Sequence, residues 1–282
     1  MAQLSRIARI VQLKTLTTLG VGGPAELWQV EGVSDLREAT SAPYRVLGGG
    51  SNLLVADDGV PERVVKLGPA YNSLAEFSAQ EDPWVGAATP LQGIVKRAAA
   101  AGLSGLEGLL GVPGVIGGAV AMNAGTRYGE LADTLEEVEV FLDGRLERLP
   151  ADALGLGYRR SELPDGAIVT RVRLKLTRAD PARIAALMAK VDAARAGQPR
   201  VRSAGCAFKN PAGDSAGRII DLSGLKGLTL GRAMVSLEHG NFIVNLGGAT
   251  ASDVLGLIEL IRERVPVPLE IEWRLWGCEG RE

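Results

Sequence analysis

The sequence predicts an α+β fold in two parts, and three observations support this prediction. Segments with the alternating or continuously apolar pattern of strands dominate residues 1–180, where few helices are expected. Two glycine-rich blocks, at 48–50 and 105–125, lie in the same part. After Asp180 and Pro181 the pattern changes to longer helices that alternate with short strands. We therefore expect a strand-rich cofactor-binding part at 1–180 and an α/β substrate-binding part at 181–282.

Residues 105–125 read GLEGLLGVPGVIGGAVAMNAG and are the segment around which we expect the chain to be organised. Interior glycines make a poor helix, because each loses more conformational entropy on folding than alanine. Glycine does allow positive φ and close backbone approach, so bare N–H groups can converge on an anion. We predict a cradle for the pyrophosphate and ring of a large cofactor, with contacts from Gly111, Pro113, Gly114, Gly117, Gly118, Asn123, Ala124 and Gly125.

Two alternatives exist for this segment. Residues 108–126 are long enough for a transmembrane helix, although Pro113, Asn123 and the glycine density argue against one. The segment also resembles a glycine-rich structural turn inside a core.

The other glycine block lies in YRVLGGGSNLLVADDGV, residues 44–60, which predicts a strand, a turn and a second strand. A triple glycine closed by Ser-Asn presents several donors at one point, which suits a diphosphate or a flavin edge. The alternative is a plain hairpin loop. We assign cofactor contacts to Gly48, Gly49, Gly50, Ser51, Asn52 and Leu53. An earlier GxGxxA match, beginning at Gly20, is discounted because Pro24 and the strand-like AELWQV follow it.

Local signals predict the remaining elements in order. In the first part we expect a helix at 35–39 with Ser34 as its cap, strands at 63–67 and 83–88, a helix at 91–101, a hairpin turning at 143–144 and a strand at 167–176. In the second part we expect helices at 181–196, near 215–224 and at 253–265, with strands at 242–246 and ending at 277.

Composition limits the class of function. The 282 residues carry a net charge of −2, which makes neither nucleic acid nor an anionic membrane an expected partner. Two distant cysteines, Cys206 and Cys278, form neither a disulfide framework nor a zinc motif. The opening residues MAQLSRIARIVQLKT lack the apolar run of a signal peptide. We expect a cytoplasmic monomer without a bound metal.

Seven blocks in order resemble one enzyme family. They are GGGSNLLV, GLEGLLGVPGVIGGAVAMNAG, YRRS, AGCAFKNP, RIIDLSGLKG, EHGNFIVN and LEIEWRLWG. Together they are similar to the UDP-N-acetylenolpyruvoylglucosamine reductase (UDP-N-acetylmuramate dehydrogenase, MurB) family. The short run between YRRS and AGCAFKNP resembles the compact type, which lacks an inserted substrate-capping segment.

The resemblance implies an FAD-binding domain of the p-cresol methylhydroxylase/vanillyl-alcohol oxidase (PCMH/VAO) type, a C-terminal α/β substrate domain, and NADPH as reductant. It implies an oxidoreductase acting on a CH–CH group in the second step of peptidoglycan precursor synthesis, and so a part in cell wall biogenesis, cell shape and cell division. The enolpyruvyl double bond of UDP-N-acetyl-3-O-(1-carboxyvinyl)-glucosamine is reduced to UDP-N-acetylmuramate, with hydride passing through FAD to C3 and a proton to C2. We expect non-covalent FAD, because His239 and both cysteines lie outside the FAD part.

The resemblance also implies the catalytic residues. Arg159 of YRRS matches the family arginine that stabilises the substrate carboxylate, although Arg160 is adjacent. Glu272 of LEIE matches the catalytic glutamate, expected to be protonated beside that carboxylate, with Glu270 as the rival. Cys206 occupies the position where most members carry the proton-donating serine.

A thiol ionises near pH 8.5 and is a stronger acid than a serine hydroxyl, so the role of Cys206 stays chemically reasonable. A small packing cysteine is the alternative. The family match assigns substrate contacts to Tyr158, Asn210, Lys226 and His239. Two other functions are open: another non-covalent FAD oxidoreductase of the same fold, and an inactive relative that only binds a nucleotide sugar.

Overall fold

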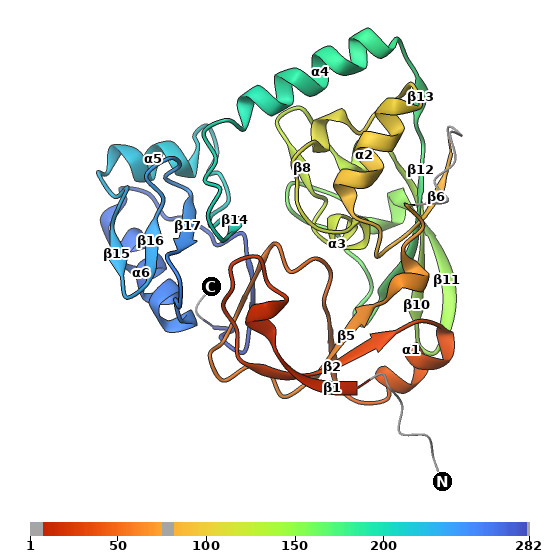
Figure 1. The fold of residues 1–282 in the computed structure, drawn as a ribbon, viewed down its shortest axis with the longest axis horizontal. Coiled ribbons are helices and arrows are strands. Elements are labelled where there is room, and N and C mark those ends of the chain that lie inside the picture. Colours follow the sequence, from red (N-terminus) through yellow and green to blue (C-terminus); the bar gives the residue numbers. More distant parts are fainter. Residues whose placement is uncertain (1–7, 75–81, 281–282) are drawn as a thin grey trace. The chain divides into compact units, whose positions relative to one another are not determined.

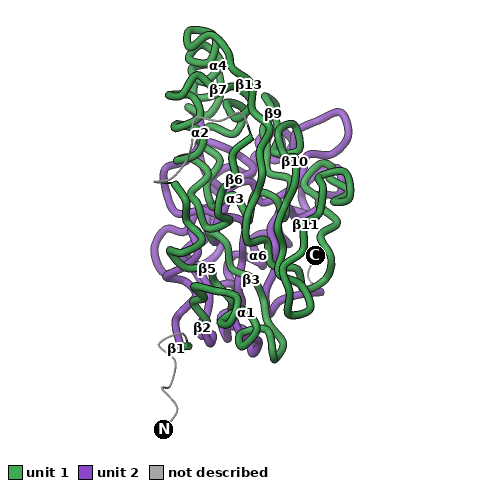
Figure 2. The backbone as a smooth tube through the Cα atoms, turned by 90° about the vertical axis from the view of Figure 1, so that its right-hand side faces the viewer, with its two compact units in different colours: residues 1–8, 28–49, 64–196 green, residues 9–27, 50–63, 197–282 purple. Residues whose placement is uncertain are grey.

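The computed structural model describes residues 8–74 and 82–280. Residues 1–7 of the opening segment that argued against a signal peptide lie outside the described residues. The chain divides into two compact units (Figure 2), which we describe one at a time. The first unit holds residues 1–8, 28–49 and 64–196, and the second unit holds 9–27, 50–63 and 197–282.

These units do not coincide with the division expected at residue 180. Helix α4 (Pro181–Ala194) belongs to the first unit, because Ile184 and Val191 are buried and Met188 packs against the core of that unit. Just after the helix, the Arg195 guanidinium donates to the Gly111 carbonyl at 2.6 Å. Two N-terminal segments, 9–27 and 50–63, belong to the second unit instead.

One sheet has the strand order β1-β2-β5-β3, and the boundary between the units falls within three of its strands. Its elements are β1 (Ala8–Gln12), η1 (Leu13–Thr15), β2 (Pro24–Val30), α1 (Val33–Ala39), β3 (Tyr44–Val46), β5 (Arg63–Leu67) and η2 (Pro69–Tyr71). The expected cap of α1 is wrong: the helix begins two residues earlier than expected, after Gly32, and Ser34 lies inside it.

A second sheet in the first unit has the order β11-β10-β12-β6, and Figure 1 shows β10, β11 and β12 running side by side. The hairpin predicted at 143–144 is confirmed, since Leu142 pairs with Arg145 and both turn residues have positive φ. The elements are β6 (Trp84–Gly86), β10 (Leu135–Leu142), β11 (Arg145–Pro150), β12 (Ile168–Leu174), η5 (Leu131–Asp133) and η6 (Ala151–Leu154).

The rest of the first unit packs against this sheet. Its elements are α2 (Leu91–Ala100), β7 (Leu103–Ser104), η4 (Glu107–Leu109), α3 (Ile116–Ala121), β8 (Gly125–Thr126), β9 (Gly129–Glu130) and β13 (Thr177–Arg178). The glycine-rich segment 105–125 thus contains one short helix despite its composition. Ile116 and Val120 explain it, because both are buried on one side of α3. Within the described residues, no helix is long and apolar enough to cross a membrane, so the transmembrane alternative is wrong.

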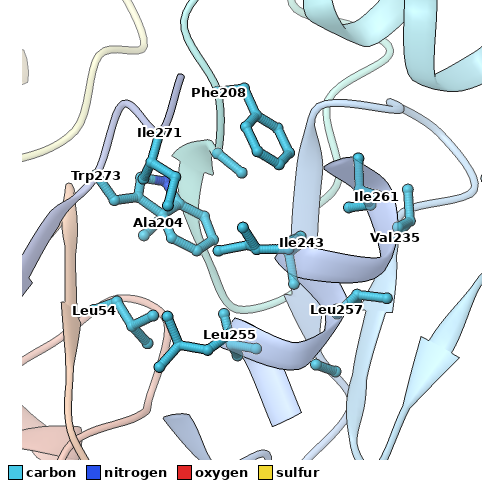
Figure 3. Close-up of a cluster of buried hydrophobic side chains, with 14 of the residues drawn as sticks. Leu54, Ala204, Phe208, Val235, Ile243, Leu255, Leu257, Ile261, Ile271 and Trp273 are labelled. Atoms are coloured by element: carbon cyan, nitrogen blue, oxygen red, sulfur yellow. The ribbon is translucent and has the colours of Figure 1, made fainter. Parts of the chain in front are cut away.

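The second unit contains a sheet with the order β14-β17-β16-β15 and a parallel pair, β18 with β4. The elements are β4 (Leu53–Val55), β14 (Ser203–Cys206), α5 (Ala216–Leu222), β15 (Thr229–Leu230), β16 (Ala233–Val235), β17 (Phe242–Asn245), α6 (Ala251–Arg264) and β18 (Arg274–Trp276). Figure 3 shows the core, where Leu255, Leu257 and Ile261 of α6 face the same cluster as Ile243 and Trp273. Burial of these side chains fixes β17 against α6.

Candidate functional site

A cavity of about 370 Å³ lies entirely within the first unit. It is lined by the residue after β3, the end of β5, the N-terminal turn of α3 and the start of β12. Its lining includes Gly48, Lys66, Gly117, Gly118 and Val169. The two glycine blocks therefore border one cavity, as a shared cofactor cradle requires.

The glycines at this cavity have different neighbours. A Cβ on Gly49 would lie 2.5 Å from the Gly114 Cα, so the two glycine blocks pack backbone against backbone. A Cβ on Gly117 would lie 2.8 Å from the Ala87 Cβ. A Cβ on Gly118, in contrast, would meet only the Val115 Cγ2 at 4.0 Å. A side chain at Gly118 would therefore meet open space rather than protein atoms.

Lys66 places the one ammonium group among the lining residues of the cavity, and the sequence analysis did not identify it. Its Nζ donates to the Gly48 carbonyl at 3.0 Å, and burial lowers the pKa of the ammonium. Among the described residues, no carboxylate forms an ion pair with it. A cation with this environment favours an anionic ligand.

Several residues assigned to the cofactor from sequence have close contacts with protein. Gly111 faces Arg195, which would collide with any side chain there, and Gly125 packs on Glu130. Asn123 is fully buried, with its amide bonded to protein on both sides. Ala124 is buried as well, and Pro113 is exposed between η4 and α3.

The block GGGSNL crosses from one unit into the other, since Gly49 ends a segment of the first unit and Gly50 begins one of the second. Gly50 has φ 63 and packs on the Leu16 carbonyl. Ser51 is half-buried. The Asn52 amide donates to the Glu272 carbonyl at 3.1 Å, and Leu53 is buried at the start of β4. The hairpin alternative is wrong, because β3 and β4 belong to different sheets.

Arg159 lies in a tight turn of the first unit. The backbones of Gly157 and Arg160 exchange two hydrogen bonds, each 3.0 Å, so Tyr158 and Arg159 form the tip. Arg159 has φ 55, in the left-handed region, and its guanidinium lies 5.2 Å from the half-exposed Tyr158 ring. The neighbouring Arg160 forms an ion pair with Glu162 at 3.4 Å.

Cys206 and Glu272 lie in the second unit, on two segments that pair directly. Glu272 N donates to the Ala207 carbonyl at 2.8 Å, and Phe208 and Ile271 pair next to it. Phe208 and Ile271 are buried in the core shown in Figure 3. Ala207 is buried in the same core, and the half-buried Cys206 directly precedes it at the end of β14, while the half-buried Glu272 directly follows Ile271 on the paired segment.

Glu270 lies on the same segment as Glu272 but has different contacts. Its carboxylate forms an ion pair with Lys209, and its carbonyl accepts a bond from Lys209 N at 2.8 Å. The Glu270 side chain is 71% exposed, whereas Glu272 is half-buried. Of the two carboxylates, Glu270 is therefore the more exposed one and is held in an ion pair.

The other predicted substrate residues of the second unit have structural contacts. Asn210 Oδ1 accepts a bond from Ala216 N at 3.0 Å, and Lys226 pairs with Asp221 at 2.6 Å. His239 Nδ1 accepts a bond from Asn241 N at 3.2 Å. Burial, together with the Lys226 charge, lowers the pKa of His239, so the imidazole is neutral with its proton on Nε2.

Asn241, the last residue of EHGN, is a second residue that sequence reasoning missed. Its side-chain amide accepts from Phe208 N at 2.9 Å and donates to Phe208 O at 2.8 Å, while its own carbonyl accepts from Ala207 N at 2.8 Å. These bonds hold the strand that follows Cys206. Its place in the EHGN motif was a signal that Asn241 could matter, but no local pattern indicated that it bonds to Phe208. Across the described ranges, no group of three or more His, Cys, Asp or Glu side chains is arranged to hold a metal, and Cys206 and Cys278 are not joined by a disulfide.

Comparison with known proteins extends these observations. Residues 20–149 match an FAD binding domain, and residues 198–275 match the C-terminal domain of UDP-N-acetylenolpyruvoylglucosamine reductase. The chain thus combines an FAD-binding domain of the expected α+β type with that C-terminal domain.

Three similar proteins carry the same description. The UDP-N-acetylenolpyruvoylglucosamine reductase of a Thermus thermophilus strain is 60% identical, with 96% of this chain and 99% of the relative covered. That of Deinococcus radiodurans is 52% identical, with 96% of each covered. The crystal structure of the enzyme from Thermus caldophilus is 60% identical with a TM-score of 0.91, covering 96% of this chain and 99% of that one. With relatives so similar over nearly their whole length, the chain belongs to the UDP-N-acetylenolpyruvoylglucosamine reductase family.

Proposed function

We propose that this chain is an NADPH-dependent flavoenzyme that reduces the enolpyruvyl group of UDP-N-acetyl-3-O-(1-carboxyvinyl)-glucosamine to give UDP-N-acetylmuramate. The observation that carries the proposal is the cavity of the first unit, which combines two glycine segments with a half-buried cation in a chain of this family. The proposal takes the chain to act as a cytoplasmic monomer on two small molecules.

The cavity residues fit a dinucleotide. Gly48, Gly117 and Gly118 let a ligand approach the backbone, and the positively charged Lys66 ammonium would bind a diphosphate. Apolar residues such as Val115 and Val169 suit the faces of a planar ring. When bound, FAD would accept hydride from NADPH and deliver it to C3 of the substrate.

Arg159 would bind the carboxylate of the enolpyruvyl group. Negative charge develops on this carboxylate as C3 gains hydride, and a fixed cation stabilises that charge most where it needs no reorganisation. The planar guanidinium can hold both carboxylate oxygens at once, which a lysine ammonium cannot. The tight turn at 157–160 supports the required rigidity, because it leaves the backbone of Arg159 little freedom.

Cys206 would deliver the proton to C2. The Sγ–H bond breaks as the C2–H bond forms, which leaves a thiolate that solvent reprotonates before the next turnover. Glu272, in its protonated form, would donate a hydrogen bond to the substrate carboxylate. Its strand pairing beside the end of β14 supports a role next to Cys206.

Four residues would bind the rest of the substrate. His239 as a neutral Nε2–H donor suits a phosphate or sugar oxygen, and Lys226 adds positive charge nearby. Tyr158 is half-exposed at the tip of the turn that carries Arg159, and Asn210 stands at the entry to α5. Ser51 and Asn52 remain proposed cofactor contacts of the second unit.

Two measurements test the proposal. The absorbance spectrum of the purified protein, taken before and after acid precipitation, should show a flavin that stays in solution. Incubation with NADPH and the enolpyruvyl substrate should then consume one NADPH per UDP-N-acetylmuramate formed. Flavin in the precipitate would favour a covalent oxidase of the same fold, and bound substrate without turnover would favour a nucleotide-sugar-binding relative.

A further inference from the structure

The turn that carries Arg159 has an unusual backbone for its sequence. Tyr158 and Arg159 are its two central residues. Among the described residues, the non-glycine residues with positive φ are Asn123, Asp143 and Arg159. A turn with positive φ at its second central position normally takes glycine or asparagine there. A strained residue of this kind persists where its surroundings hold it, and such residues cluster at functional sites.

Asn123 is the residue that holds this turn from inside. It is 0% exposed, and its Nδ2 donates to the Gly157 carbonyl at 3.1 Å while its Oδ1 accepts from Ala132 N at 2.9 Å. The Gly157 carbonyl also accepts the turn's own bond from Arg160 N. One buried amide thus ties the turn to the segment at 130–133 through both of its polar atoms.

A second bond anchors the other side of the turn. The Ser161 hydroxyl donates to the Ala121 carbonyl at 2.9 Å. Ala121 is the last residue of α3, and Asn123 follows it by two positions. Both anchors therefore begin at the C-terminal end of α3.

The same helix borders the proposed cofactor cavity from its first turn to its last residue. Gly117, Gly118 and Ala121 all line it. Six helical residues span about 9 Å, so α3 is a short rigid connection within the first unit between the cavity and the anchored turn.

We propose that Asn123 is a positioning residue for catalysis: it holds the Gly157–Arg160 turn so that the Arg159 guanidinium stays at a fixed place relative to the cofactor cavity, with Ser161 as a second anchor. The inference rests on the proposed function, in which Arg159 binds the substrate carboxylate. It gives Asn123 a role that differs from the direct cofactor contact expected from the sequence.

The chemistry of the position explains why asparagine is suited to it. One short side chain must supply a donor to Gly157 O and an acceptor to Ala132 N. Aspartate has the same shape but only accepts, so Asn123→Asp keeps the bond from Ala132 and replaces the bond to Gly157 with repulsion between oxygens. Asparagine also tolerates the φ of 43 found here.

The matched control is Gln92→Glu. Gln92 is an amide that also holds the glycine-rich segment, donating to the Leu109 and Val112 carbonyls and accepting from Gly111 N at 2.7 Å. It has no bond to the 157–160 turn. The same amide-to-acid change at Gln92 measures how far the rates fall when the glycine-rich segment is loosened but the turn that carries Arg159 keeps its bonds.

The experiment separates the two half-reactions by stopped flow in the FAD-loaded protein. In Asn123→Asp, flavin reduction by NADPH should stay within about twofold of wild type, while the limiting rate of reoxidation by the enolpyruvyl substrate should fall by about tenfold or more, by analogy with a displaced transition-state donor. Gln92→Glu should show no selective loss of reoxidation. Ser161→Ala should show the same selective loss to a smaller extent, and it decides the matter if Asn123→Asp does not fold.

A double-mutant cycle with Arg159→Asn completes the test. If Asn123 acts through Arg159, then Asn123→Asp should slow reoxidation in wild type but change it less than about twofold when Arg159 is already absent. An equal loss in both backgrounds, or a loss shared by both half-reactions, would overturn the positioning role. A wild type whose reduced flavin is not reoxidised by the substrate would instead overturn the proposed function.

Discussion

Gly118→Ala tests the cofactor cavity with a change that the protein itself can accommodate. The new Cβ would meet only the Val115 Cγ2 at 4.0 Å, an ordinary contact, and Gly118 lies within α3. Alanine in a helix is favoured over glycine by about 0.5–1 kcal/mol, so the flavin-free protein should become more stable by up to that amount. The same methyl group enters the space we assign to FAD.

The opposite effect is expected on FAD binding. Overpacking a filled site costs about 1–3 kcal/mol, which corresponds to a rise in Kd of roughly 5- to 150-fold. Thermal melts of the flavin-free protein measure the first effect, and titration of FAD fluorescence measures the second. Gly117→Ala is the control, because its Cβ would lie 2.8 Å from the Ala87 Cβ and should lower the stability of the flavin-free protein.

The two signs together make the prediction strict. A Gly118→Ala protein that is stabilised and binds FAD as tightly as wild type would show that the cofactor does not occupy this part of the cavity. A protein destabilised before any flavin is added would show that Gly118 contacts protein, contrary to the geometry described above.

Three further predictions concern single residues. Lys66→Met should weaken FAD binding at neutral pH. Because burial lowers the pKa of Lys66, the affinity of the wild type for FAD should fall as the pH rises through that lowered pKa, and should approach the affinity of the variant, which should not change with pH. FAD titrations in which the affinities of both proteins change with pH in the same way would refute the role. Cys206→Ser should retain substantial reoxidation of reduced flavin by the substrate and resist alkylating reagents, while Cys206→Ala should reduce normally and reoxidise very slowly; Ala at the wild-type stopped-flow rate would make Cys206 a packing residue. Glu272→Gln should slow reoxidation by roughly tenfold or more, and Glu270→Gln, which removes only an exposed pair with Lys209, should not; the reverse order of steady-state kcat values would exchange the two assignments.

The sequence predicted well where a local signal is sufficient. Asp143 and Gly144 carry their own turn chemistry, and Asp180 caps α4 by accepting a bond from Ala182 N at 2.9 Å. The glycine blocks were also identified from composition alone, and Gly48, Gly117 and Gly118 do line a cavity.

Tertiary partners could not be predicted in the same way. A glycine in the sequence can indicate that a side chain is excluded, but not whether a ligand or the protein excludes it. In the structure, Gly114 excludes a side chain at Gly49, and Arg195 excludes one at Gly111. Lys66 lies in the predicted strand RVVKL, and no local pattern indicated that its ammonium would bond to the Gly48 carbonyl at a cavity.

The structure also gives adjacent candidate residues different surroundings. Arg159 and Arg160 cannot be distinguished by residue type, but Arg159 has a left-handed backbone and Arg160 forms an ion pair with Glu162. Glu270 and Glu272 share a strand face, and Lys209 distinguishes them. Each distinction follows from an ion pair or a φ angle that no local pattern encodes.

The most direct test of the central claim is anaerobic reduction of the purified protein by one equivalent of NADPH, followed by addition of UDP-N-acetyl-3-O-(1-carboxyvinyl)-glucosamine. The flavin absorbance should first bleach, and then return as one equivalent of UDP-N-acetylmuramate forms. A reduced flavin that stays bleached with substrate bound, or one that reoxidises only when oxygen is admitted, would contradict the account.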